Sequence, residues 1–275
     1  MPTEGTLADL FYLFVMGIMP YVSATIFFGG IIYRIADWFR SDQKSQSLEF
    51  KEPSSIASYA TSTTDQVQSQ SVGYKKTPSI PRRIVNLVKG IILEIFFLRR
   101  VYRGSFKLWL ITWPTHIALL GMLIGHARLA IEFTPIWDAL HFTESEIEAF
   151  SGLTGSIVGV IFIGGITILL LRRIFVKEIR KISILGDYFL LILLLVKGFL
   201  GMTMRFIPEA HVSMFNEIRP YFLNMLALNP MPIVANPYFA LHLFVVEVLL
   251  IYLPFSKLIH IISLTITQVV RGISK

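Results

Sequence analysis

Long runs of apolar residues recur along the chain between shorter polar segments, and this pattern predicts membrane-spanning helices. A helix needs about 20 mainly apolar residues to cross the hydrocarbon core of a bilayer. The mean hydropathy is +0.64 and 54% of the residues are hydrophobic, which leaves little room for a water-soluble domain. We therefore expect an all-α integral membrane protein, a bundle of five transmembrane helices over residues 7–35, 108–133, 153–171, 188–204 and 238–268.

Two segments depart from this pattern. Residues 36–81 are rich in Ser, Thr, Gln and Lys and have too few apolar side chains to offset the entropy of ordering, so we expect a cytosolic linker or partner-binding segment. Residues 82–100 are apolar over too short a run to cross and have basic ends. They predict an amphipathic helix at the membrane interface, with burial against a partner as the alternative.

Two prolines fall inside predicted spans. Pro20 predicts a kink in the first span, where a neighbouring helix must satisfy the carbonyl that loses its partner. Pro254 predicts a second kink in the last span.

The formal net charge of +7 lies mainly in loops, which favours a topology signal over a nucleic-acid partner. The loop after the third span and the C-terminal tail are basic, whereas the loop after the second span is acidic. By the positive-inside rule the N-terminus is outside and the C-terminus is in the cytosol, as expected for a multi-pass protein of the cell membrane. The chain contains no Cys. This excludes disulfides, cysteine-ligated iron–sulfur clusters and covalent haem attachment in this chain.

Four histidines lie inside two of the predicted spans. His116 and His126 are in the second span, and His242 and His260 are in the fifth. These spans are antiparallel in the predicted topology, so His126 is level with His242 and His116 with His260. In a continuous helix the eighteen residues from His242 to His260 make five turns, so both rings would share one face, about 27 Å apart. Two facing imidazoles at each of two depths are the axial ligands that two stacked haems require. A single zinc site does not fit, because its ligands must meet in one cluster.

Several stretches resemble a known family. They are Pro20-Tyr21-Val22, HIALLGMLIGH at 116–126, RRIF at 172–175, GDYFLLILLLVKGFLGM at 186–202 and LHLFVVEVLLIYLPFSKLIH at 241–260. The chain resembles the membrane-anchoring cytochrome b, or gamma, subunit of respiratory nitrate reductase and its relatives in sulfite-reduction-linked and heterodisulfide-reduction complexes.

The resemblance implies two haem b groups, a menaquinone-type quinone as substrate near the outer haem, and a cytosolic iron–sulfur partner among further subunits of a membrane complex. The chain would then be the quinone-reactive electron-transfer subunit of an oxidoreductase. The resemblance assigns His126 and His242 to the outer haem iron and His116 and His260 to the inner one. It further assigns Gly125 to the quinone site, and Arg172 and Arg173 to the inner haem propionates.

One departure bears on the choice within the family. Nitrate-type members carry a lysine in the outer loop after the second span, where this chain has Glu144, Glu146 and Glu148. The Ser-rich first loop and the MRFIP stretch at 204–208 also fit the sulfite-linked or heterodisulfide-type relatives better. We favour that type over the gamma subunit of a nitrate reductase.

Each of several charged residues in or near the predicted spans has two interpretations. Arg128 and Arg205 either snorkel at the outer interface or pair with an outer-haem propionate, and Lys257 has the same two options at the inner side. Lys197, in the middle of the fourth span, is either a partner of a haem propionate or proton path or pairs with Glu247. The remaining histidines, His141 and His211, fall in outer loops, His211 with a possible role as quinol proton acceptor.

Two functions of other classes stay open on the sequence alone. A proton-coupled transporter would use the intramembrane histidines and Lys197 as a relay, although no internal repeat is evident. A purely structural membrane anchor would need none of them.

Overall fold

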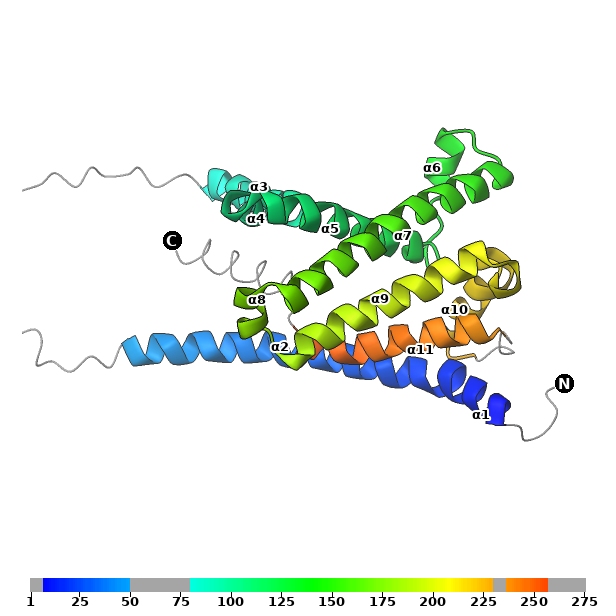
Figure 1. Cartoon of the computed structure of the whole chain (residues 1–275), viewed down its shortest axis with the longest axis horizontal. Coiled ribbons are helices and arrows are strands. Elements are labelled where there is room, and N and C mark those ends of the chain that lie inside the picture. The colour runs from blue at the N-terminus through cyan, green and yellow to red at the C-terminus, as the bar shows by residue number, and fades with distance from the viewer. Residues whose placement is uncertain (1–6, 50–79, 230–235, 257–275) are drawn as a thin grey trace, which may run out of the picture.

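The computed structural model describes residues 7–49, 80–229 and 236–256, and every regular element in these ranges is helical (Figure 1). Five helical segments are long and apolar enough to cross a membrane: Leu7–Trp38, Phe106–Ala127, Glu144–Phe175, Leu185–Phe206 and Pro237–Phe255. The prediction of an all-α protein with five spans is confirmed, and the chain is a multi-pass membrane protein.

The spans pack in a series. The helix α5 (Phe106–Ala127) packs on α7 (Glu144–Phe175), α7 on α9 (Leu185–Phe206), α9 on α11 (Pro237–Tyr252), and α11 on α2 (Met19–Glu49). A core of Phe162, Leu194 and Val245 joins α7, α9 and α11. Large apolar side chains point away from this core, as Leu123 (66% exposed) and Val160 (61%) show. Such outward apolar faces suit a lipid environment.

Short elements cover the two ends of the bundle. The helices α6 (Thr134–Ala139) and α10 (Arg219–Leu226) lie at one end, together with the short turns η2 (Pro208–Ala210) and η3 (Met214–Ile218) (Figure 1). We call this the His126 end. The helix α8 (Lys177–Ile182) lies at the opposite end, which we call the α8 end.

The first span contains the distortion that Pro20 predicts. It begins with α1 (Leu7–Leu13), widens into a π-helical turn, η1 (Phe14–Ile18), and continues as α2. Pro20 has no N–H to donate to the Met16 carbonyl four residues earlier. The Tyr221 hydroxyl of α10 donates to that carbonyl instead, at 2.7 Å. The prediction that a neighbouring helix satisfies the freed carbonyl is confirmed.

Two helices extend beyond the predicted spans. α2 continues to Glu49, into the segment expected to be a linker, and α7 begins at Glu144 rather than near residue 153. Thr143 and Glu146 form a capping box at the start of α7, each side chain accepting a backbone N–H of the other residue. Hydropathy predicts only the part of a helix that lies in the hydrocarbon core. The helix itself can extend beyond that core as far as its capping residue, so its observed bounds are wider.

The predicted interfacial segment forms two helices, α3 (Ile80–Phe97) and α4 (Arg99–Gly104), separated by Leu98 with a left-handed φ of 47°. The indole N–H groups of Trp109 and Trp113 donate to the carbonyls of Phe97 and Phe96, each at 2.8 Å. These bonds satisfy carbonyls at the end of α3 and fix it to the start of α5.

The last span changes at Pro254. α11 ends at Tyr252 and a 3₁₀ turn, η4 (Leu253–Phe255), follows. The Arg34 guanidinium of α2 donates to the Pro254 carbonyl at 3.1 Å, and Gly30 lies against the Pro254 ring. The departure from a regular helix that Pro254 predicts is therefore confirmed. His260, Lys257 and the rest of the predicted span to 268 lie outside the described residues.

Candidate functional site

Two histidine rings face each other at the His126 end. His126 lies in the last turn of α5, and His242 lies near the start of α11, whose first amides are capped by the Asn236 side chain. The ring centres are 6.5 Å apart and the ring planes are 12° from parallel. The structure brings together the two histidines that the predicted topology places at one level.

Hydrogen bonds within α5 orient the rings of its two histidines. His126 Nδ1 lies 2.7 Å from the Met122 carbonyl, and His116 Nδ1 lies 2.7 Å from the Thr112 carbonyl. Because a carbonyl only accepts, each Nδ1 carries the proton and each Nε2 presents a lone pair. Histidines that bind metals characteristically have their second nitrogen fixed in this way.

The ring separation fits a bis-imidazole metal site. An imidazole nitrogen binds a transition metal at about 2.0–2.1 Å, and the ring centre lies about 1.1 Å further back, so rings on opposite sides of one ion have centres about 6.2 Å apart. The observed 6.5 Å agrees with this value. The described residues contain no group of three or more His, Cys, Asp or Glu that could hold a metal ion. The donor set is therefore two imidazoles, which suits a planar haem that supplies its own four nitrogens.

The helix α9 forms the wall beside His242. A Cβ added at Gly201 would lie 3.4 Å from His242 Cε1, so the ring sits directly against this glycine. His242 is buried, and its Nδ1 is oriented toward the backbone carbonyl of Lys197. This Nδ1 atom makes no hydrogen bond with any group in the described part of the chain. Small adjustments of this ring are therefore possible without breaking a bond.

The inner histidine is held on the same helix. His116 is half-buried in α5 beside Thr115, whose side chain fills the space that the missing Cβ of Gly165 leaves on α7. Its expected partner, His260, is outside the described residues. The pairing of His116 with His260 stays a prediction.

Arg128 is buried rather than snorkelling. It is 5% exposed, pairs with Glu132 at 3.0 Å, hydrogen-bonds Ser151 and lies over the rings of Trp137 and Phe215. The snorkelling interpretation is wrong, because aromatic rings and a carboxylate provide a partner inside the protein. One of its nitrogens, Nη2, makes no hydrogen bond within the described residues.

Glu132 joins the elements of the His126 end. It accepts from the Trp137 indole at 2.8 Å and lies 4.0 Å from the Arg219 guanidinium. Burial alone would raise the pKa of the Glu132 carboxyl, but the hydrogen bonds from Trp137 and Arg128 and the Arg128 charge outweigh it and lower the pKa below its usual range.

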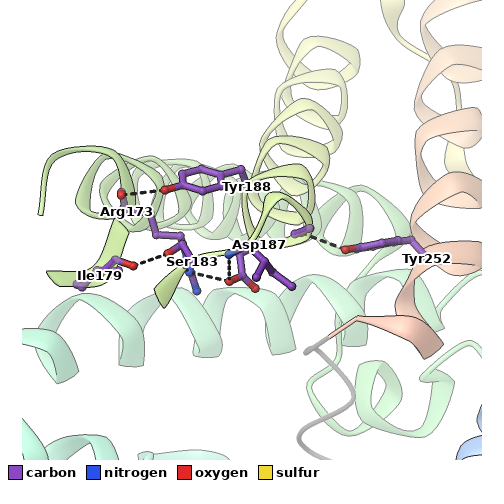
Figure 2. Close-up of polar contacts among 8 residues, drawn as sticks. Arg173, Ile179, Ser183, Asp187, Tyr188 and Tyr252 are labelled. Atoms are coloured by element: carbon purple, nitrogen blue, oxygen red, sulfur yellow. Dashed lines mark hydrogen bonds and ion pairs between the residues drawn. The ribbon is translucent and has the colours of Figure 1, made fainter. Parts of the chain in front are cut away.

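The two arginines of the basic pair, Arg172 and Arg173, lie in different environments, and Figure 2 shows the contacts of Arg173. Arg173 donates to Ser183 at 2.7 Å and to Asp187 at 3.1 Å, and the Tyr188 hydroxyl donates to the Arg173 carbonyl. Asp187 is 5% exposed and also accepts from the Ile184 amide. The Arg173 guanidinium therefore already binds groups of the protein. The half-buried Arg172 side chain is the better candidate for binding an added anion such as a propionate.

The expected quinone-site residues lie near His126. A Cβ at Gly125 would meet nothing within 4 Å, so the chain leaves open space at this position. Of the three loop carboxylates, Glu146 accepts from the Thr143 amide and hydroxyl and so belongs to the cap of α7. His141, in the loop, and His211, after η2, are both exposed at this end.

Comparison with known proteins decides the family. Residues 104–274, which include all four intramembrane histidines, match the family described as nitrate reductase gamma subunit. The chain belongs to this family. The resemblance read from the sequence is confirmed.

Relatives in the family have three kinds of name. The chain is 33% identical over 273 residues to the Hdr-like menaquinol oxidoreductase cytochrome b-like subunit of Archaeoglobus fulgidus, covering 88% of this chain and 74% of that protein. It is 31% identical over 190 residues to a subunit of the dihydromethanophenazine:CoB–CoM heterodisulfide reductase of Methanosarcina barkeri, covering 65% and 64%. It is 24% identical over 261 residues to the nitrate reductase gamma chain of Bacillus subtilis, covering 93% of both chains. These relatives are subunits of oxidoreductase complexes, which supports a role in an enzyme complex.

Some residues of the site were missed from the sequence. Asp187, Glu132 and Trp137 make long-range or loop contacts that periodicity does not report. The sequence could have predicted the ion pair of Glu132, because Arg128 and Glu132 have the i, i+4 spacing at which oppositely charged side chains meet on a helix.

Proposed function

We propose that the chain is a di-haem cytochrome b subunit of a respiratory oxidoreductase complex, exchanging electrons between a menaquinone-type quinone and a cytosolic iron–sulfur partner. The observation that carries this is the His126–His242 pair, with ring centres 6.5 Å apart. The free Nε2 lone pair of His126, set by its bond to Met122, supports ligation of one haem iron by these two rings.

The second haem rests on the other two histidines. His116 has the same Nδ1 arrangement as His126 and lies ten residues earlier on α5, about 15 Å along the axis. We propose that it ligates the inner haem with His260, and that Arg172 and Lys257 balance propionate charge there. When bound, the two haems supply one-electron carriers across the membrane.

The quinone site is proposed beside the outer pair. Two relatives carry menaquinol oxidoreductase in their names, and Gly125 leaves open space one residue before His126. Protons would exchange with the outer aqueous phase, in the orientation with the N-terminus outside. We favour a sulfite-linked or heterodisulfide-type complex over a nitrate reductase, because the Hdr-like relatives reach 33% identity against 24% for the nitrate reductase gamma chain.

A reduced-minus-oxidised spectrum of the purified chain with haem quantitation tests the main proposal. We expect b-type spectra and two haems per chain. A chain purified from membranes with normal haem supply that contains none would overturn the proposal. Retained ion flux in that haem-free chain would favour a transporter, and a redox-silent, flux-silent chain would favour a structural anchor.

The quinone site has its own test. A Gly125→Ala substitution has room in the fold, so a change in quinol turnover or inhibitor affinity would report on the bound quinone rather than on folding. Gly164→Ala on α7, where a Cβ also meets nothing within 4 Å, is the matched control. Unchanged turnover and inhibitor affinity in Gly125→Ala protein with both haems would refute the placement.

A further inference from the structure

Lys197 is a cation in the middle of a span, and its counter-charge is missing from the described part of the chain. It lies in α9 and forms no ion pair with any described residue. An isolated cation at this depth costs a few kcal/mol, so such residues are retained mainly where they serve a function.

The expected pairing of Lys197 with Glu247 is wrong. Glu247 is 1% exposed in α11, and neither of its carboxyl oxygens has a hydrogen-bond partner within the described residues. Its electrostatic influence falls on Tyr221 of α10 instead. The two groups are on helices that pack together, but their side chains are directed to different neighbours.

Lys197 lies on the face of α9 that packs against His242. The Lys197 carbonyl is the group toward which His242 Nδ1 points, and Gly201, one turn later, contacts the same ring. The Lys197 ammonium interacts electrostatically with both imidazoles, and Arg205, further along α9, acts on His126. One face of α9 therefore brings positive charge to a site whose imidazole ligands are neutral.

A haem b would supply the missing negative charge, because it carries two propionate carboxylates. We propose that Lys197 is the intramembrane counter-charge of the haem held by His126 and His242 and raises the reduction potential of that haem. This inference rests on the proposed function. Reduction adds one electron to the iron, and a nearby cation stabilises the more negative reduced form, so the potential rises. The ligands of the other haem lie about 15 Å away along α5, and because the Coulomb energy falls with distance that haem responds less.

Potentiometric titration of each haem, followed by its visible absorbance in the purified full chain, tests the inference. Lys197→Met removes the charge while keeping the length of the side chain. We expect the midpoint potential of one haem to fall so far that its reduced-to-oxidised ratio at a fixed potential drops at least tenfold, which is 59 mV for one electron. Lys197→Arg should retain the wild-type value. Lys89→Met, on the exposed surface of α3, is the control and should leave both potentials unchanged.

The outcomes separate the two proposals. A wild-type chain without haem contradicts the proposed function. Two haems with unchanged potentials in Lys197→Met protein, or equal shifts of both haems, contradict the role of Lys197. If Lys197→Met protein does not accumulate, Lys197→Gln, which keeps a polar headgroup, provides the same comparison: a selective fall supports the inference and unchanged potentials overturn it.

Discussion

The two ends of the bundle use their buried charges differently. At the α8 end, Arg173 and Asp187 pair with each other, and Ser183 and Tyr188 complete the network. At the His126 end, Arg128 Nη2, Glu132 Oε2 and Arg219 Nε are buried without a hydrogen bond among the described residues. Among the described residues, the Arg173–Asp187 network of the α8 end thus satisfies its own charges. Two of the atoms at the His126 end have ion-pair contacts instead, Arg128 Nη2 with Glu132 Oε1 at 3.0 Å and Glu132 Oε2 with Arg219 Nη1 at 4.0 Å, and the pair of imidazoles lies at the same end.

The largest expected effect removes a ligand at the His126 end. His242→Ala should leave one haem per chain instead of two, because the remaining imidazole, His126, provides only one axial bond. Haem quantitation of the purified variant against total protein gives the ratio. His141→Ala, an exposed loop histidine of the same end, should retain both haems. Two haems in His242→Ala protein would contradict the proposal that His242 holds a haem at the His126 end.

The next effect tests whether the α8 end is held by its own ion pair. Arg173→Ala removes the cation that pairs with the Asp187 carboxylate, which is 5% exposed. Breaking a buried pair from one side costs about 3–5 kcal/mol, and the partial exposure of Arg173 places the expected loss at about 2–3 kcal/mol. Thermal unfolding in detergent measures it.

A control on the neighbouring helix sharpens that experiment. Arg180→Ala in α8 removes an exposed cation whose contact with the Ile174 carbonyl is 3.5 Å long, and should change stability little. Equal losses in both variants would indicate a general effect of charge at this end.

A smaller effect is expected where α10 reaches the first span. Tyr221→Phe leaves the Met16 carbonyl unpaired, at a cost of about 1–2 kcal/mol. Burial raises the pKa of the Tyr221 phenol, so it stays a donor at neutral pH. In a Pro20→Ala background the carbonyl regains a helical N–H partner, and the same Tyr221→Phe change should cost less. A double-mutant cycle by thermal unfolding measures the difference. Additive losses would mean that Tyr221 does not compensate for Pro20.

The smallest effect is a pH dependence at the His126 end. The pKa of Glu132 is lowered in the folded protein from its ordinary value of 4.5. Its contribution to stability is therefore present above pH 4.5 and is lost as the pH falls through the folded-state pKa. Glu132→Gln should flatten stability against pH in this acidic range and leave it unchanged in slope near neutral pH. An unaltered acid slope in the variant would assign the dependence to other carboxyls.

The sequence predicted the features that depend on hydrophobic runs and on topology. The five spans and the meeting of His126 with His242 follow from run length and from the direction in which each span crosses. Contacts between distant segments did not follow, because hydropathy gives no information on which side chains meet. For example, no pattern in the sequence predicted that the indoles of Trp109 and Trp113 would cap α3. Lys197 and Glu247 are both ionisable and both inside spans, and only the packing of α9 on α11 shows that they point to different neighbours.

The bonds between the first and last parts of the chain bear on how the protein is made. The Met16 carbonyl accepts a hydrogen bond from Tyr221, which is synthesised 205 residues later. The Arg34 guanidinium donates to the Pro254 carbonyl, which is synthesised 220 residues later. At about 5–20 residues per second of synthesis, the first span spends about 10–40 s in the membrane before these partners emerge. Throughout that interval the Met16 carbonyl and the Arg34 guanidinium lack the partners that they have in the folded protein. The first span therefore depends on the insertion machinery, water or another subunit until the chain that completes it has been translated.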